Sequence, residues 1–174
     1  MTSRRKRNLT ILSKWVVYFL FLLVAATLQS LPGFLQIGSV KPLFILPFCL
    51  GVAIYQGEYS GAFFAVLGGF LWDWTGGRIG GLMALGMMLV CFFAAMLVEL
   101  YLRVNYINFI LVTFACALLM LSTDFLFYYL MQDYVAGLHR YLWVVVPSAV
   151  YTALLSPLSM KAARFVAGRF VVED

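Results

Sequence analysis

Long apolar runs separated by short polar intervals set the pattern of this 174-residue chain. Because about 20 helical residues cross the roughly 30 Å hydrocarbon core of a bilayer, such runs predict transmembrane helices. The runs lack the apolar–polar alternation of membrane β-strands, which favours an all-α integral membrane protein. We expect one membrane domain, 1–174, built as a bundle of six transmembrane helices at about 14–31, 43–56, 59–74, 82–102, 106–131 and 141–160.

The second and third runs are shorter than the others. They are expected to form either thin spans or a re-entrant hairpin, and both arrangements return the chain to its starting side. The first run, Trp15 to Leu31, has spanning length and no small-x-small cleavage site, which predicts an uncleaved span rather than a signal peptide. The basic tail, 161–174, is expected to form either a short interfacial helix or a frayed end.

The composition supports a membrane location. Hydrophobic residues make up 64% of the chain, charged residues only 11%, and the mean hydropathy is +0.98. A soluble domain averages about 25% charged residues, so this chain has too little polar surface for one. Its polar intervals are also too short to contain a separate soluble domain.

The net charge of +5 follows a topological pattern rather than a nucleic-acid-binding one. Five cations precede the first run, Arg103 lies between the fourth and fifth, and three cations follow the last run. With both termini cytoplasmic these nine lie inside, whereas Lys41, Arg78 and Arg140 lie outside. The positive-inside rule therefore predicts cytoplasmic termini.

Residues for metal or catalytic chemistry are scarce. Cys49, Cys91 and Cys116 lie within apolar runs, no C-x-x-C pair occurs, and His139 is the one histidine. We expect the cysteines to be small buried apolar residues, with no metal or cofactor site. The sequence also lacks G-x-S-x-G, H-E-x-x-H and paired-carboxylate patterns, so neither catalytic residues nor an enzyme is predicted.

Four acidic residues lie within or beside the membrane segments: Asp73, Glu99, Asp124 and Asp133. A charged carboxylate at mid-bilayer costs about 2.5–3.5 kcal/mol, so such residues are usually paired or functional. Glu99 precedes Arg103 by four residues, which predicts an ion pair on one helix face. Asp133 lies beyond its run and is expected to be solvated.

Asp124 is the deepest of these acids. It is expected either to be a hydrogen-bonded core residue, with Ser122, Thr123 or another helix as partner, or to form an interaction or ligand site. Asp73 lies between two tryptophans, which favour the membrane interface, so its carboxylate is expected near headgroup depth.

Small residues recur at every fourth position around the third run. Gly61, Ala65 and Gly69 form a stripe that drifts by about 40° per step around a helix. Such stripes allow helix backbones to approach closely in lipid, so a tightly packed third helix is predicted. The pairs Gly76–Gly77 and Gly80–Gly81 are expected to end the helix and form a turn. Their spacing does not match a phosphate-binding loop.

These patterns resemble the rod shape-determining protein MreD family of bacteria. The resemblance rests on Lys41-Pro42 before the second run, on "GAFFAVLGGFLWD" from Gly61 to Asp73, and on "GLMALG" from Gly81 to Gly86. The sixth run adds "PSAVYTALLSPL", Pro147 to Leu158, similar to a Tyr-Thr-Ala-Leu-x-x-Pro element of the family. Length, six runs and a basic N-terminus agree, so the resemblance covers nearly the whole chain.

The resemblance implies a non-enzymatic scaffold in the bacterial inner membrane that maintains rod cell shape. Such proteins bind the single-span protein MreC and, through it, connect the MreB filament with RodA and a penicillin-binding transpeptidase of peptidoglycan synthesis. Their fold is similar to that of the substrate-capturing subunits of energy-coupling-factor transporters. The candidate residues for helix packing or partner contact are Gly61, Ala65, Gly69, Asp73, Gly81, Asp124 and Pro157.

A vitamin-binding subunit of such a transporter is the main alternative. Its ligand pocket would open on the outer face, where Trp72, Asp73, Trp74 and Arg78 are expected. Polar residues are few on the outer turns, which argues against this alternative.

Overall fold

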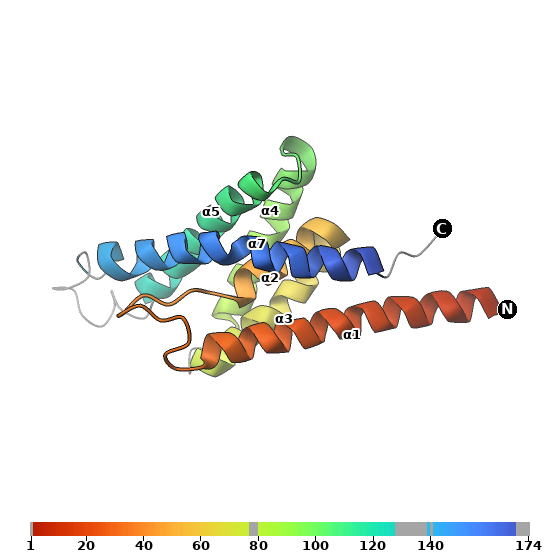
Figure 1. Cartoon of the computed structure of the whole chain (residues 1–174), viewed down its shortest axis with the longest axis horizontal. Helices are drawn as coiled ribbons and strands as arrows, with labels where there is room; N and C mark the ends of the chain where they lie inside the picture. Colours follow the sequence, from red (N-terminus) through yellow and green to blue (C-terminus); the bar gives the residue numbers. More distant parts are fainter. Residues whose placement is uncertain (1, 77–79, 128–138, 140, 170–174) are drawn as a thin grey trace.

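The computed structural model describes residues 2–76, 80–127, 139 and 141–169. In these residues the chain is all-α, with six α-helices and the π-helical turn η2, in the order α1 (Thr2–Ser30), α2 (Ile45–Gln56), α3 (Glu58–Gly76), α4 (Leu82–Tyr101), α5 (Tyr106–Phe125), η2 (Tyr141–Val145) and α7 (Val146–Arg169). Figure 1 shows these helices gathered in one bundle, with α1 and α7 as its longest members.

Four stretches in the described part of the chain are long and apolar enough to cross a membrane. They are Arg7–Ser30, Leu82–Tyr101, Tyr106–Phe125 and Tyr141–Arg169, which correspond to α1, α4, α5 and η2 with α7. The chain is therefore a multi-pass membrane protein. Helix α2 is apolar but has only 12 residues, or about 18 Å of helix.

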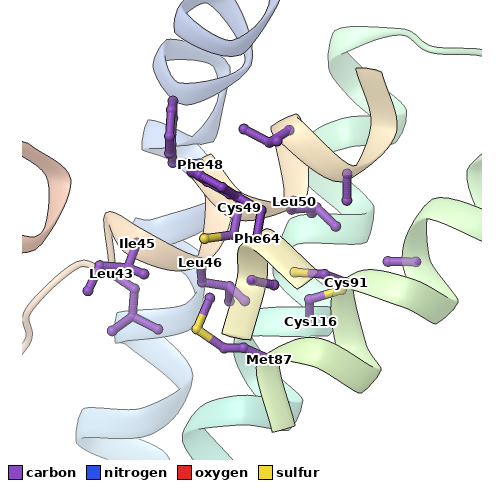
Figure 2. Close-up of a cluster of buried hydrophobic side chains, with 14 of the residues drawn as sticks. Leu43, Ile45, Leu46, Phe48, Cys49, Leu50, Phe64, Met87, Cys91 and Cys116 are labelled. Atoms are coloured by element: carbon purple, nitrogen blue, oxygen red, sulfur yellow. The ribbon is translucent and has the colours of Figure 1, made fainter. Parts of the chain in front are cut away.

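Helix α2 lies at the centre of the bundle, and this position explains its sequence. All residues from Ile45 to Ala53 are buried, so the helix is apolar on every side. Figure 2 shows Ile45, Leu46, Phe48, Cys49 and Leu50 of α2 packed with residues of the neighbouring helices. Those neighbours include Phe64 of α3, Met87 and Cys91 of α4, and Cys116 of α5. The three cysteines are all buried in this core.

The first turn of α1 and the last turn of α7 lie at the same end of the molecule, on the right in Figure 1. We call this the terminal end. The opposite, distal end contains the last turn of α1, the segment 31–44 and the start of η2. The last turn of α3 also lies there, because Thr75 and Gly76 line the same cavity as Ser30 and Val144.

Some helices are longer than their apolar runs predict, and others are slightly shorter. Helix α1 begins at Thr2 rather than near residue 14, since backbone hydrogen bonding continues past the apolar residues. Helix α2 begins at Ile45 rather than 43, α3 covers 58–76 rather than 59–74, and α4 ends at 101 rather than 102. Helix α5 is α-helical to Phe125 and π-helical at 126–127, and its expected end at 131 lies outside the described residues.

The basic tail continues the last helix. Residues 161–169 extend α7 beyond its expected end at 160, and Ala163 and Val166 are buried in the bundle. These residues therefore form neither a separate interfacial helix nor a frayed end, because their small and apolar side chains pack against other helices. Residues 170–174 of the expected tail lie outside the described part.

Candidate functional site

Asp73 joins the end of α3 to the start of α4. Its side chain is only 2% exposed, and its two carboxylate oxygens accept hydrogen bonds from the backbone N–H groups of Gly81 (2.8 Å) and Met83 (3.3 Å). The first N–H groups of a helix have no partner within the helix and carry a partial positive charge. A carboxylate therefore stabilises the start of α4, where Gly81 adopts the left-handed conformation with φ 102°.

The depth of Asp73 in the membrane stays a prediction, but the two tryptophans that flank it differ in exposure within the bundle. Trp74 is 89% exposed. Asp73 and Trp72, by contrast, are buried, because successive positions on a helix point in different directions. Arg78, expected on the outer face with these residues, lies outside the described residues.

The small-residue stripe of α3 contacts two different helices. A side chain at Gly61 would overlap the backbone of Ala53 in α2, whereas one at Gly69 would overlap the backbone of Ala84 in α4. The drift of about 40° per step rotates Gly69 by about 80° from Gly61, so one stripe serves both neighbours. Ala65, midway along the stripe, is fully buried. The opposite face of α3 carries exposed apolar side chains, including those of Phe63 and Phe70.

The chain reaches α2 through a buried non-helical segment. Leu43 and Phe44 are both less than 10% exposed, yet they precede the helix. Backbone polar groups at such a position need partners, because neither water nor a helix supplies them. Gln29 of α1 provides one, since its Oε1 accepts the N–H groups of Phe44 (3.0 Å) and Ile45 (3.1 Å).

Helix α7 provides the other partners of this segment. The hydroxyl of Thr152 accepts the N–H of Leu43 at 2.9 Å, and that of Ser148 accepts the N–H of Lys41 at 3.4 Å. Pro42, between them, has no N–H to satisfy. Lys41 also donates from Nζ to the carbonyl of Leu31, just beyond α1, at 3.2 Å.

Pro157 lies inside α7, where its missing N–H leaves the carbonyl four residues earlier, at Ala153, without its usual donor. The buried hydroxyl of Ser156 donates to that carbonyl at 2.7 Å. Ser156 therefore replaces the hydrogen bond that Pro157 removes, and the helix continues to Arg169.

An open cavity of about 410 Å³ lies at the distal end, and we call it the distal cavity. Asp124 of α5, 6% exposed, contributes to its wall, as does Trp72 of α3. The two hydroxyls expected near Asp124 form hydrogen bonds with other residues: Ser122 with the hydroxyl of Tyr141 at 2.8 Å, and Thr123 as donor to the carbonyl of Leu119. The other polar side chains of the wall are those of Gln29, Ser30, Gln36, Ser39, Lys41, Thr75 and Ser148.

The predicted ion pair on α4 is wrong. Helix α4 ends at Tyr101, and Leu102 has extended backbone angles (φ −119°, ψ 140°), so Arg103 does not lie one turn after Glu99. The carbonyl of Arg103 instead accepts hydrogen bonds from the backbone N–H of Asn105 and the side chain of Asn108. Glu99 lines a second hollow, of about 300 Å³, near the α2–α3 turn. Asp133 lies outside the described residues.

The structure thus separates the candidate residues into groups. Gly69, Asp73 and Gly81 come together at the α3–α4 joint, Gly61 and Ala65 pack within the bundle, Pro157 lies in α7, and Asp124 faces the distal cavity. The sequence alone did not identify Gln29, Ser148 and Thr152 as side chains that accept hydrogen bonds from backbone N–H groups. Their signal in the sequence is their type: each is a polar side chain within a long apolar run.

These observations define a multi-pass α-helical membrane protein whose buried polar side chains largely bind its own backbone. Among the described residues, no group of three His, Cys, Asp or Glu side chains is arranged to hold a metal ion. The chain belongs to the rod shape-determining protein MreD family, whose model matches residues 10–166. It is accordingly a rod shape-determining membrane protein of a generally non-enzymatic family. No curated protein and no solved structure matches the chain.

Proposed function

We propose that this chain is a non-enzymatic scaffold subunit of the bacterial cell-wall elongation complex. In this role it binds MreC in the inner membrane and links the MreB filament, through MreC, to RodA and a penicillin-binding transpeptidase. The observation that carries the proposal is the family match over residues 10–166. The buried side chains of Asp73, Gln29 and Thr152 accept hydrogen bonds from backbone N–H groups. This structural use of buried polar groups supports a non-enzymatic role.

The proposed topology has six passes with both termini in the cytoplasm. The shared terminal end of α1 and α7 supports an even number of passes (Figure 1). In this topology α2, together with the buried segment before it, forms the second pass and α3 the third. The excess of Lys and Arg at the terminal side, nine against three, supports the cytoplasmic placement. A cysteine-labelling experiment with a membrane-impermeant thiol reagent, on a variant with one cysteine at Ser3, tests it; labelling of intact cells would contradict it.

Within this function we propose Asp124 as a contact for a cationic group of the partner. Its carboxylate is placed in the wall of an open cavity rather than in the closed core around α2. Asp124→Asn keeps the shape of the side chain and removes its charge. We expect it to reduce co-purification of MreC and to round the cells while the melting temperature stays near that of wild type. Normal rod shape with normal MreC recovery would contradict this role.

Depletion of the protein in a rod-shaped host, scored by cell shape, tests the function as a whole. Cells that remain rods in the absence of a paralogue would refute the scaffold. The vitamin-binding alternative, with a fold similar to energy-coupling-factor subunits, is favoured by one observation, the polar distal cavity. Mass spectrometry of small molecules released from the purified protein separates the two functions, since a stoichiometric vitamin is expected only for the transporter subunit.

A further inference from the structure

Three helices meet close to the terminal end of the bundle. Gly51 of α2 lies against Ala163 of α7 and Phe109 of α5. Beyond this junction α2 continues for one turn to Tyr55, α7 continues to Arg164, and α5 reaches its first residue, Tyr106. Arg164 directly follows Ala163, Tyr55 lies about one turn after Gly51, and Tyr106 lies about one turn before Phe109, so the junction brings these three positions to the same end of the three helices.

A buried hydrogen-bond network fixes this arrangement. Tyr18 of α1 is fully buried; its hydroxyl donates to the carbonyl of Ala163 at 3.3 Å and accepts a hydrogen bond from Nε2 of Gln56 at 3.0 Å. Ala163 and Gln56 are the sequence neighbours of Arg164 and Tyr55. The backbone positions from which Arg164 and Tyr55 project are therefore held by the core, which reduces the conformational freedom lost on binding a ligand.

Arg164 contributes a positive charge to this end of the three helices. Among the described residues, Arg164 forms neither a hydrogen bond nor an ion pair, and its side chain is exposed. Tyr55 and Tyr106 add two phenolic hydroxyls. Helix α5 begins at this point without an acidic residue in its first turn and without a side-chain cap from Asn105, so its partial positive charge adds to that of Arg164.

We propose that Arg164, Tyr55 and Tyr106 bind the phosphate of an anionic phospholipid at the membrane surface on the terminal side. An arginine guanidinium matches the oxygens of a phosphate group, and tyrosine hydroxyls favour headgroup depth. Exposed apolar side chains flank the cluster and suit acyl chains rather than a soluble phosphate: Ile107 is 72% exposed and Phe165 is 62% exposed. This site is separate from the distal cavity and goes beyond the proposed scaffold function.

Native mass spectrometry of the full-length protein in detergent, titrated with phosphatidylglycerol and with phosphatidylcholine, tests the site. We expect wild-type protein to prefer phosphatidylglycerol, and Arg164→Gln to weaken its first binding step about tenfold, as for loss of a charge-assisted hydrogen bond. Arg169→Gln is the matched control, since it removes the same charge from the last turn of the same helix and should change affinity less than about twofold.

Equal losses in the Arg164 and Arg169 variants would overturn the site in favour of diffuse electrostatic attraction. Unchanged lipid affinity in Arg164→Gln would also overturn it, and impaired growth of that variant would then indicate an acidic protein surface as the partner. Tyr55→Phe with Tyr106→Phe provides an independent variant if Arg164→Gln lowers the melting temperature. This double variant should weaken phosphatidylglycerol binding about threefold, and wild-type affinity would contradict the proposal.

Discussion

The contact between α3 and α4 at Gly69 leads to the sharpest prediction. In Gly69→Ala, the added methyl group would overlap the backbone of Ala84 and the carbonyl of Met83. A side chain in such a position can rotate away, but helix backbone cannot. The substitution therefore requires α3 and α4 to move apart, although alanine is the smallest possible replacement for glycine.

The magnitude follows from two opposing effects. Overpacking a well-packed interior costs about 1–3 kcal/mol, and contact with backbone places Gly69→Ala near 3 kcal/mol. Alanine regains about 1 kcal/mol relative to glycine inside a helix, because it loses less backbone freedom on folding. The net destabilisation is about 2 kcal/mol, which for a chain of this size lowers Tm by about 4–8 °C.

Thermal unfolding in detergent, monitored by circular dichroism, measures this change. Gly168→Ala is the matched control, because Gly168 of α7 has open space where its side chain would be. It should leave Tm unchanged or raise it slightly. If Gly69→Ala is as stable as wild type, α3 and α4 do not approach at this position and the packing argument is wrong.

Three further substitutions test the buried polar contacts by the same unfolding measurement. Asp73→Ala leaves the first N–H groups of α4 without an acceptor and should lower the free energy of unfolding by about 2–3 kcal/mol. Asp73→Asn keeps an acceptor oxygen and should lower it by about half as much. Equal stability of both variants and wild type would exclude the cap. Gln29→Leu should cost about 2–4 kcal/mol through two buried N–H groups, whereas Gln29→Glu, which keeps the acceptor, should be milder. Ser156→Ala should lower the free energy of unfolding by about 1 kcal/mol more in the wild-type background than in the Pro157→Ala background, because alanine at 157 restores the missing N–H. If the two substitutions are additive in this double-mutant cycle, Ser156 does not replace the hydrogen bond that Pro157 removes.

Much of the helix arrangement follows from local pattern, and so it could be predicted from the sequence. Apolar runs locate α1, α4, α5 and α7, because the cost of unpaired backbone in lipid allows few alternatives to a helix. The small residues at 61, 65 and 69 likewise indicate close packing, since their spacing places them on one helix face. Which helix packs against each of them does not follow from spacing alone.

The polar contacts depend on residues distant in sequence, and they were less predictable for that reason. Glu99 and Arg103 have the spacing of an ion pair, but α4 ends between them, and hydropathy does not determine where a helix ends. Gln29 and Thr152 become acceptors only because the segment before α2 lies between α1 and α7. The partners of an isolated polar residue in an apolar run are set by the tertiary fold.

The motifs that carry the family resemblance contact one another in pairs, which affects how loss of function is interpreted. The segment at Lys41-Pro42 and Leu43 meets α7 at Ser148 and Thr152, and the motif ending at Asp73 meets the one beginning at Gly81. These contacts hold the bundle together, and most of the residues that form them are buried. A variant at such a position that rounds the cells therefore reports on folding before it reports on partner binding. At Asp124, which lies in the wall of the distal cavity, the proposed contact with MreC predicts that recovery of MreC falls in Asp124→Asn while Tm stays near that of wild type.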